Sequence, residues 1–575
     1  MSSDDERSFM KSIFHGLLEE NLVFPYLEMD PEEKENVNLI LENIRRFAES
    51  EVDSAQIDHD HEIPEALLTK MKEMGLFGLA IPEAHGGFGL SATAYARVIQ
   101  EVAAFDASLA VTIGAHQSIG CKALVLFGTD EQKQKYLPAL ATGERVAAFA
   151  LTEPGAGSDA ASITTRAELD DDGTTYVLNG SKIWITNGGF ADVFTVFART
   201  SAPDPGVKPR ITALIVERGE GLTNGPNEEK MGIRGSSTTE IFFEDVRVPT
   251  ENVLGEAGRG FKVAMEVLNN GRLGLASGSL GACKRLLAMS TDRVQERQAF
   301  GRPIGEFGMI KEKIARMTAE IFALESMTYL TTGLIDAGVD DYSLESAICK
   351  VYGSETLWFV VNETLQIAAG IGYMSEYPYE RMMRDARINM IFEGTNEILR
   401  AFIALSGMQS PGKQLAEVAK AMREPIKGFG LLREFAIHKA RSMVSRERLE
   451  RVHPVLRREA VIFEDGVAEL AQAVEQALRK HGRDIAEMQF VQKRVAEVAM
   501  DLYALAAVLS RTTRAIERKG EAGATREIHL THAFAQLAQP RLTDRLSAME
   551  RDRDELLKEV ASQTYEDAGY PFDVV

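Results

Sequence analysis

The hydrophobic pattern of this chain changes near residues 149 and 256, and these two changes constrain its fold more than any other feature. Between them, short runs of β-branched and aromatic residues, such as Ile211-Thr-Ala-Leu-Ile-Val, alternate with turn signals such as Asn179-Gly180. On either side, apolar residues recur at helical spacing. Many short strands without intervening helices are typical of an antiparallel barrel or sandwich. The sequence therefore predicts a mainly α protein with a central β domain.

Four domains follow from this pattern. We expect an N-terminal helical domain at 1–148, a β-barrel domain at 149–256, a helical bundle at 257–410 and a C-terminal helical extension at 411–575. The tripeptide Ser410-Pro411-Gly412 is expected to separate the last two, because proline and glycine disfavour a helix interior. A chain of 575 residues is too long for one core, since domains usually hold about 100–200 residues.

Composition excludes several classes of function. The formal net charge of −22 argues against nucleic acid as a partner, because phosphate binding needs a basic surface. The three cysteines, Cys121, Cys283 and Cys349, form no CxxC pair and no metal-ligand spacing, which predicts a reducing compartment and no metal site. No apolar run approaches the roughly 18 residues that a membrane-spanning helix needs. The acidic N-terminus resembles neither a secretory signal nor a transit peptide. We expect a cytoplasmic bacterial protein, or a mitochondrial matrix protein if the chain is a processed eukaryotic one.

Three short segments carry the chemistry. They are Ala-Leu-Thr-Glu-Pro-Gly-Ala-Gly-Ser-Asp at 150–159, Lys-Ile-Trp-Ile-Thr-Asn-Gly-Gly at 182–189 and Ile-Phe-Glu-Gly-Thr-Asn-Glu-Ile at 391–398. Glu393 stands between two bulky apolar residues and Gly394, a setting that desolvates a carboxylate and raises its pKa toward that of a general base. An isolated Glu-Gly-Thr is more often a solvated or helix-capping sequence. The presence of the other two segments favours the catalytic interpretation.

Together with Arg297-Gln-Ala-Phe-Gly301 and Gln366-Ile-Ala-Ala-Gly370, these segments resemble the acyl-CoA dehydrogenase family in order and spacing, from about residue 40 to residue 408. The segments at 24–26, 114–120, 255–265 and 268–272 are similar to the very-long-chain branch of that family, which also has a C-terminal helical extension. The family resemblance implies FAD-dependent removal of a proton and a hydride from adjacent carbons of a long-chain or very-long-chain acyl-CoA, as in fatty acid β-oxidation. The product is trans-2-enoyl-CoA, and the electrons pass to an electron-transfer flavoprotein. Two alternatives stay open: an acyl-CoA oxidase that uses oxygen, and a non-catalytic assembly protein that keeps the fold.

The resemblance also implies roles for individual residues. Glu393 is the base, because the other position that family members use for this role is Gly271 here. Its backbone N–H joins a flavin hydroxyl in binding the thioester carbonyl. The residues implied for FAD are Phe149, Leu151, Thr152, Gly157, Ser158, Trp184, Ile185, Thr186, Arg297, Phe300, Gln366, Ala369, Gly370, Thr395 and Glu397. Those implied for the substrate are Ser158, Asn269, Arg272, Phe392 and Gly394.

Several of these residues also have an ordinary structural interpretation. Trp184 suits the core of a β-barrel, Arg297 suits a solvated helix end, and Arg272 suits a structural ion pair. The small residues from Ala110 to Ala115 favour a long acyl tail, because small side chains leave room for it.

Assembly is a further expectation. Family segments like 297–301 and 366–370 reach the flavin of a neighbouring subunit, so the resemblance implies a homodimer in which the C-terminal extension takes the place of a second dimer. The basic segment from Phe435 to Arg458 has two interpretations. It forms either an amphipathic helix that makes a peripheral contact with anionic lipid or a solvated loop.

Overall fold

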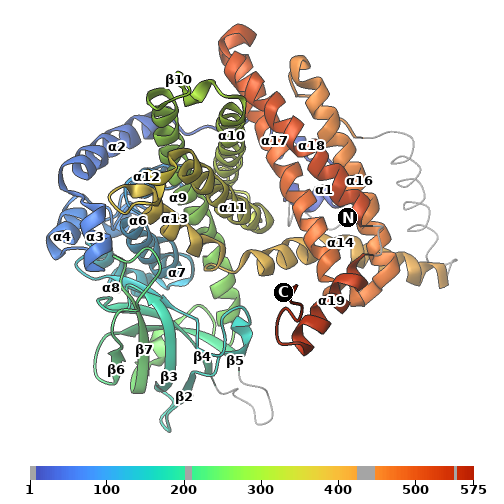
Figure 1. The fold of residues 1–575 in the computed structure, drawn as a ribbon. Helices are drawn as coiled ribbons and strands as arrows, with labels where there is room; N and C mark the ends of the chain where they lie inside the picture. Colours follow the sequence, from blue (N-terminus) through green and yellow to red (C-terminus); the bar gives the residue numbers. More distant parts are fainter. Residues whose placement is uncertain (1–7, 201–209, 424–446, 550–552, 575) are drawn as a thin grey trace. The chain divides into compact units, whose positions relative to one another are not determined.

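The computed structural model describes residues 8–200, 210–423, 447–549 and 553–574. It divides into two compact units (Figure 1). One unit comprises residues 27–398, and the other combines residues 1–26 with 399–575. The association of the N-terminal residues with the C-terminal extension is a finding that the sequence did not predict.

The unit of residues 27–398 begins with helices. They are α2 (Pro31–Glu51), α3 (Ser54–Asp60), α4 (Glu65–Glu73), α5 (Ala92–Phe105), α6 (Ala107–Gly114), the π-helical segment η3 (Ala115–Cys121), α7 (Lys122–Phe127) and α8 (Asp130–Thr142). Helix α2 starts at Pro31 because Asp30 accepts hydrogen bonds from the amides of Glu32 and Glu33. Its buried face, at Val37, Leu41, Ile44 and Phe47, has the spacing of one side of a helix.

The β domain is one eight-stranded sheet. Its strands are β1 (Ala147–Ala150), β2 (Arg166–Leu169), β3 (Thr175–Thr186), β4 (Val193–Thr200), β5 (Arg210–Glu217), β6 (Leu222–Asn224), β7 (Thr238–Pro249) and β8 (Val253–Leu254). The order is β6-β7-β3-β2-β4-β5-β8, with β1 beside β4. The expectation of a purely antiparallel domain was wrong for two pairs, since β1 and β2 both run parallel to β4. Parallel neighbours need a long connection, which the chain through β3 supplies.

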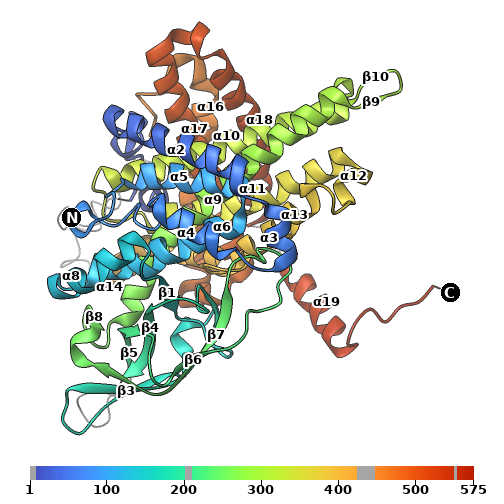
Figure 2. The same cartoon turned by 90° about the vertical axis from the view of Figure 1, so that its left-hand side faces the viewer.

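Long helices complete the unit. They are α9 (Gly260–Glu296), α10 (Gly308–Asp336), α11 (Ser343–Ala368), α12 (Gly370–Tyr373), α13 (Pro378–Arg387) and the start of α14 (Asn396–Arg423). Helix α9 packs against α5, α10 and α11. It approaches α5 so closely that a Cβ on Gly281 would lie 1.9 Å from the Gln100 carbonyl. A hairpin of β9 (Gln298–Ala299) and β10 (Arg302–Pro303) extends beyond the end of α9, as Figure 2 shows.

The second unit is helical. It contains α1 (Phe9–Ile13), most of α14, α16 (Arg457–His481), α17 (Gln489–Gly523), α18 (Thr525–Ala548) and α19 (Asp554–Glu566). Phe9 of α1 packs against Phe463 and Tyr503, with ring centroids 6.4 and 6.3 Å away. The predicted break at Ser410-Pro411-Gly412 was wrong, because α14 continues through Pro411. A proline removes one helical hydrogen bond, and the buried residues Ala404 and Met408 anchor the helix just before it.

Part of the basic segment from Phe435 to Arg458 lies outside the described residues, namely 435–446. Within the described part, Arg451 donates its backbone N–H to Glu20 at 2.6 Å and its guanidinium to the Phe24 carbonyl. Arg457 forms an ion pair with Glu464. These two arginines therefore stabilise the second unit itself.

One described helical stretch, Ala107–Phe127, is long and apolar enough to cross a membrane by length and composition. From the sequence, no stretch of this kind was expected. It comprises α6, η3 and α7, and 56% of its most apolar window is buried inside the protein. Contacts with α5, α9 and β1 account for that burial.

Candidate active site

A cavity of about 730 Å³ lies within the unit of residues 27–398. One wall is a single face of α9, formed by Gly271, Gly274, Leu275, Gly278, Ser279, Ala282, Arg285 and Met289. Residues of α5, α6 and η3 form the opposite wall, among them Ala110, Gly114, Ala115 and Ser118. Phe392 and Glu393 line the cavity beside Gly271. The predicted base and the predicted run of small residues therefore meet at one site.

Glu393 sits in a tight turn that precedes α14. Its φ angle is +59° and that of Gly394 is +89°, so the turn combines a glycine with a residue in the left-handed region. A non-glycine residue there costs on the order of 1–3 kcal/mol. The turn ends where the Thr395 hydroxyl accepts a hydrogen bond from the amide of Ile398 at 3.3 Å. The predicted flavin residue Thr395 thus caps α14.

The environment of Glu393 matches that of a general base. Its Oε2 atom is buried and has no hydrogen-bond partner among the residues that the structure describes. Burial raises the pKa of Glu393, while Arg272 and Lys350 act in the opposite direction. The predicted rise in the pKa of Glu393 is confirmed. The expected desolvation by its neighbour Ile391 was wrong. Ile391 is 47% exposed, and the close contacts of the carboxylate come from across the fold.

Gly271 is one of those contacts. A Cβ on Gly271 would lie 2.9 Å from Oε2 of Glu393 and 2.9 Å from Cγ2 of Ile119. Positions 271 and 393, the two that the resemblance offered for the base, therefore place a side chain in the same part of the cavity. Glycine at 271 leaves the room that the Glu393 side chain occupies.

Lys350 is a site residue that the sequence analysis missed. Its side chain is 0% exposed, and Nζ donates to the Gly394 carbonyl at 2.7 Å and to Oδ1 of Asn396 at 2.9 Å. Burial lowers the pKa of Lys350 to about 7, against the opposing influence of Glu393. Through these two hydrogen bonds, Lys350 fixes the position of the Glu393-Gly394 turn. The sequence signal was a lysine inside the apolar run Ala347-Ile-Cys-Lys-Val.

Arg272 and Asn269, both predicted substrate residues, contact each other. Arg272 donates to Oδ1 of Asn269 at 2.8 Å and lies 3.5 Å from the Glu393 carbonyl. Burial lowers the pKa of Arg272, and Glu393 acts against this. Its position beside the carboxylate suits both a charge partner for Glu393 and a substrate contact, and the latter stays a prediction.

Two of the predicted flavin segments lie side by side. The Thr152 carbonyl accepts a hydrogen bond from the amide of Ile183 at 3.0 Å. Lys182 Nζ donates to the Leu151 carbonyl at 3.0 Å and to Glu153 at 2.8 Å. Hydrogen bonds and the Lys182 charge outweigh burial and hold the pKa of Glu153 at about 2, while burial lowers the pKa of Lys182 to about 8. This ion pair, which the sequence analysis missed, fixes the loop after β1 against β3.

The surface of these segments fits a planar ring. A Cβ on Gly155 or Gly157 would meet no atom within 4 Å, so the backbone there is open to close approach. Trp184 is 60% exposed, which rules out the alternative of a barrel-core aromatic. Thr186 lines the cavity. Phe149, Leu151 and Ile185 are partly or fully buried and pack in the cores beneath, so only their backbone groups are available to a cofactor.

The remaining predicted flavin residues lie apart from the cavity. Arg297, Gln366, Ala369 and Gly370 are exposed, and Phe300 at the tip of the hairpin is 94% exposed. They stand at the ends of α9 and α11 and do not line the cavity. Ser158 and Glu397 are also exposed. This outward placement agrees with the expectation that the first group serves a neighbouring subunit, which stays a prediction.

Comparison with known proteins identifies the family. The acyl-CoA dehydrogenase N-terminal, middle and C-terminal domains match residues 34–144, 148–246 and 258–408, and the ACAD9/ACADV C-terminal domain matches residues 454–570. The very long-chain specific acyl-CoA dehydrogenase of human mitochondria is 44% identical over 95% of this chain and 85% of its own length. A probable acyl-CoA dehydrogenase of Bacillus subtilis is 38% identical over 84% of this chain and 81% of its own. An acyl-CoA dehydrogenase from Bacillus anthracis, solved in complex with FAD, has a TM-score of 0.81 and 34% identity and covers 98% of this chain and 96% of its own. By domain order, sequence and fold, this chain belongs to the acyl-CoA dehydrogenase family.

Proposed function

We propose that this protein is an FAD-dependent dehydrogenase that converts long-chain or very-long-chain acyl-CoA to trans-2-enoyl-CoA. The observation that carries the proposal is the buried Glu393 carboxylate at one end of a long cavity, with its pKa raised and Oε2 free of partners among the described residues. The similarity to very long-chain specific relatives over 95% of the chain supports the same substrate class.

The chain supplies the groups for proton removal. Glu393 Oε2 accepts the α-proton, and Arg272 and Lys350 favour the ionised carboxylate that this step requires. The backbone N–H of Glu393 makes no hydrogen bond within the described part of the chain. It is therefore available to donate to the thioester carbonyl, where negative charge develops. The buried setting strengthens both interactions.

FAD, when bound, supplies an acceptor for the hydride from the β-carbon. Thr152, Gly157, Ser158 and Thr186 are the residues of this chain that would hold it near the cavity, and the exposed face of Trp184 would lie against a planar ring. The ion pair between Lys182 and Glu153 keeps the two segments that carry these residues together.

The length of the cavity supports a long acyl chain. From Gly271, beside the base, to Arg285, α9 spans about 21 Å at ~1.5 Å per residue. An extended chain advances about 1.2 Å per bond, as the ~3.3–3.6 Å of an extended three-bond residue implies. The cavity therefore holds an acyl chain of roughly 16–20 carbon atoms.

Partner, assembly and compartment complete the proposal. The electron acceptor is an electron-transfer flavoprotein, and the protein is a homodimer in which Arg297, Phe300 and Gln366 serve the partner's cofactor. Mitochondrial and bacterial relatives are both similar to this chain, so we place it in a bacterial cytoplasm or, for a processed eukaryotic chain, in the mitochondrial matrix. Lipid contact through residues 435–458 stays a hypothesis. Arg451 and Arg457 already form contacts within the protein, with the Phe24 carbonyl and with Glu464.

Steady-state turnover tests the proposal. Acyl-CoA thioesters from short to very long are offered to the holoenzyme with a ferricenium acceptor, and we expect a maximum of kcat/KM at roughly 16–20 carbons. A maximum at short chains, or no turnover, contradicts it. Anaerobic reduction by substrate, followed by exposure to air, separates the oxidase alternative. A dehydrogenase reoxidises slowly in air, whereas an oxidase recovers at its turnover rate.

A further inference from the structure

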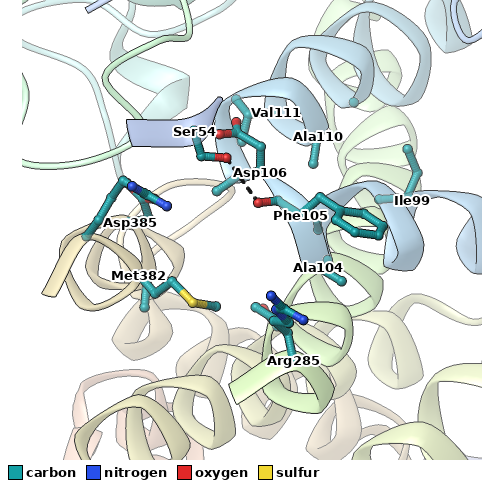
Figure 3. Close-up of a pocket in the computed structure, with 18 of the residues that line it drawn as sticks. Ser54, Ile99, Ala104, Phe105, Asp106, Ala110, Val111, Arg285, Met382 and Asp385 are labelled. Atoms are coloured by element: carbon teal, nitrogen blue, oxygen red, sulfur yellow. Dashed lines mark hydrogen bonds between the residues drawn. The ribbon is translucent and has the colours of Figure 1, made fainter. Parts of the chain in front are cut away.

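Charged side chains mix with apolar ones at the end of the cavity that is remote from Gly271 along α9. Arg285 and Met289 of α9, Arg381 and Asp385 of α13, and Asp106 before α6 line it. Figure 3 shows Arg285, Asp106 and Asp385 approaching this part of the cavity from three different elements, with Ser54 beside Asp106. An apolar pocket for a simple acyl chain has no need of these groups at its far end.

Two cations line this end of the cavity, Arg381 and the exposed Arg285. Arg285 is the one that points to a ligand. It makes no hydrogen bond or ion pair with any residue that the structure describes. Its neighbour Lys284, in contrast, is paired with Glu325. Arg381 likewise makes no hydrogen bond or ion pair with a described residue, but it favours the ionised forms of Asp58 and Asp106, so part of its charge is already compensated. Arg285 therefore has all its donors available to a ligand in the cavity.

The nearby carboxyl groups form no ion pair with Arg285. Asp106 accepts a hydrogen bond from the amide of Leu109 at 3.0 Å, and Asp385 accepts one from the amide of Ile233. Burial raises the pKa of Asp106, and it raises the pKa of Asp385 to about 7. Asp385 is thereby less anionic than an ordinary aspartate at neutral pH. Glu49, Glu51 and Glu376 also line this end; they are exposed, as Arg285 is, so solvent and salt screen all four charges.

This arrangement has a consequence for the substrate. A methyl terminus placed here would meet charged side chains as well as apolar ones such as Phe105 and Met382, and would gain less from burial than in a wholly apolar pocket. A polar terminus would keep its hydration or pair with Arg285, and a carboxylate suits the planar donor fork of a guanidinium. We propose that this end of the cavity is a subsite for a polar ω-group, and that long-chain acyl-CoA carrying an ω-carboxylate is a substrate whose far carboxylate pairs with Arg285. This inference rests on the proposed function.

The spacing selects the chain length. Gly271 and Arg285 are 14 residues apart on one face of α9, or about 21 Å. The mono-CoA thioester of a diacid of about 16–18 carbons spans this distance when extended. Shorter diacids would leave the carboxylate among the apolar side chains of the cavity, so we expect them to be poor substrates.

The test compares hexadecanoyl-CoA with the mono-CoA thioester of hexadecanedioic acid. The holoenzymes are wild type, Arg285→Gln and, as control, Lys311→Gln, which removes an exposed charge on α10 that does not line the cavity. We expect wild type to oxidise both thioesters. Arg285→Gln should lower kcat/KM for the ω-carboxylated thioester by roughly threefold to tenfold, in line with a charge-assisted pair at a solvent-accessible site. It should leave hexadecanoyl-CoA within about twofold of wild type, as should Lys311→Gln for both substrates.

Binding provides an independent readout. Each thioester is titrated into Glu393→Gln holoenzyme with and without Arg285→Gln, and we expect the same selective loss in Kd. If hexadecanoyl-CoA is oxidised and the ω-carboxylated thioester is not, the inference fails while the proposed function stands. An equal effect of Arg285→Gln on both thioesters, or no effect, overturns the role of Arg285. If neither thioester is oxidised, the proposed function fails and this inference fails with it.

Discussion

We expect replacement of Lys350 by methionine to leave the free energy of unfolding nearly unchanged while it lowers kcat. The Lys350 ammonium is buried, and its pKa falls from 10.5 to about 7. Because the folded pKa lies below the unfolded one, stability rises with pH between about 7 and 10.5, and below pH 7 the buried charge costs about 4–5 kcal/mol. Methionine has a similar length and removes this cost. It also removes the hydrogen bonds to the Gly394 carbonyl and Asn396.

The loss of those hydrogen bonds offsets the gain. Hydrogen bonds that involve a charged group contribute about 1.5–3 kcal/mol each, and an orphaned carbonyl adds to the loss. Asn396 keeps Ser354 and Glu355 as partners, so mainly the Gly394 carbonyl is left unpaired. We therefore expect the free energy of unfolding of Lys350→Met to lie within about 2 kcal/mol of wild type.

Catalysis should respond differently. Lys350 favours the ionised form of Glu393, so its removal raises the pKa of Glu393 further. The acid limb of the pH profile of kcat/KM should move to higher pH, and kcat at pH 7 should fall at least about tenfold, because the turn that carries the base loses its anchor.

The assay pairs pH-dependent kcat/KM with thermal unfolding. Lys313→Met is the control, because Lys313 is also a partly buried, ion-paired lysine but contacts Glu363, away from the turn. Its pH profile should match wild type. An unchanged acid limb in Lys350→Met, with normal kcat, would refute the reasoning.

Three further variants test other parts of the site. Gly271→Ala should slow substrate-dependent flavin reduction at least about tenfold in stopped-flow measurements, because its Cβ would lie 2.9 Å from Oε2 of Glu393; a wild-type rate would mean that the carboxylate has more room than the structure gives it. Gly278→Leu should shift the kcat/KM maximum to shorter acyl chains, since the new side chain would enter the cavity midway along α9, and an unchanged chain-length profile would contradict the assignment of the cavity. Arg297→Ala should weaken FAD retention and dimer stability together, as dialysis and analytical ultracentrifugation would measure, because a ligand shared across an interface stabilises the assembly; a monomer that retains FAD tightly would exclude the shared site.

Local patterns predicted much of the fold and part of the site. The helical spacing of Leu39, Ile40, Ile44 and Phe47 predicted a helix with one buried face. The structure buries Ile44 and Phe47, but Leu39 is 57% exposed, and Val37 and Leu41 complete the buried face in its place. The short β-branched runs predicted the strands of the β domain. The parallel pairing of β1 and β2 with β4 escaped prediction, because strand order depends on contacts between segments far apart in the chain.

At the site, too, local sequence patterns predicted some features, and contacts between distant segments determine the others. Glu393 was identified from its immediate neighbours, but the room for its carboxylate depends on Gly271, more than 100 residues earlier, where a Cβ would lie 2.9 Å from Oε2. Lys350 and Lys182 were missed because a buried lysine is recognisable only once its acceptors are placed around it. The local signal for a break at Pro411 was wrong, because the packing of α14 outweighs it.

The most direct test of the central claim is anaerobic stopped-flow reduction of the bound flavin by hexadecanoyl-CoA in wild type and Glu393→Gln. Loss of a general base lowers the rate by at least about 10²-fold. We predict a reduction of that size, with FAD content and the Kd for the thioester unchanged, because glutamine preserves the shape of the side chain and removes its basicity. A Glu393→Gln holoenzyme that is reduced at close to the wild-type rate would contradict the assignment of Glu393 as the base.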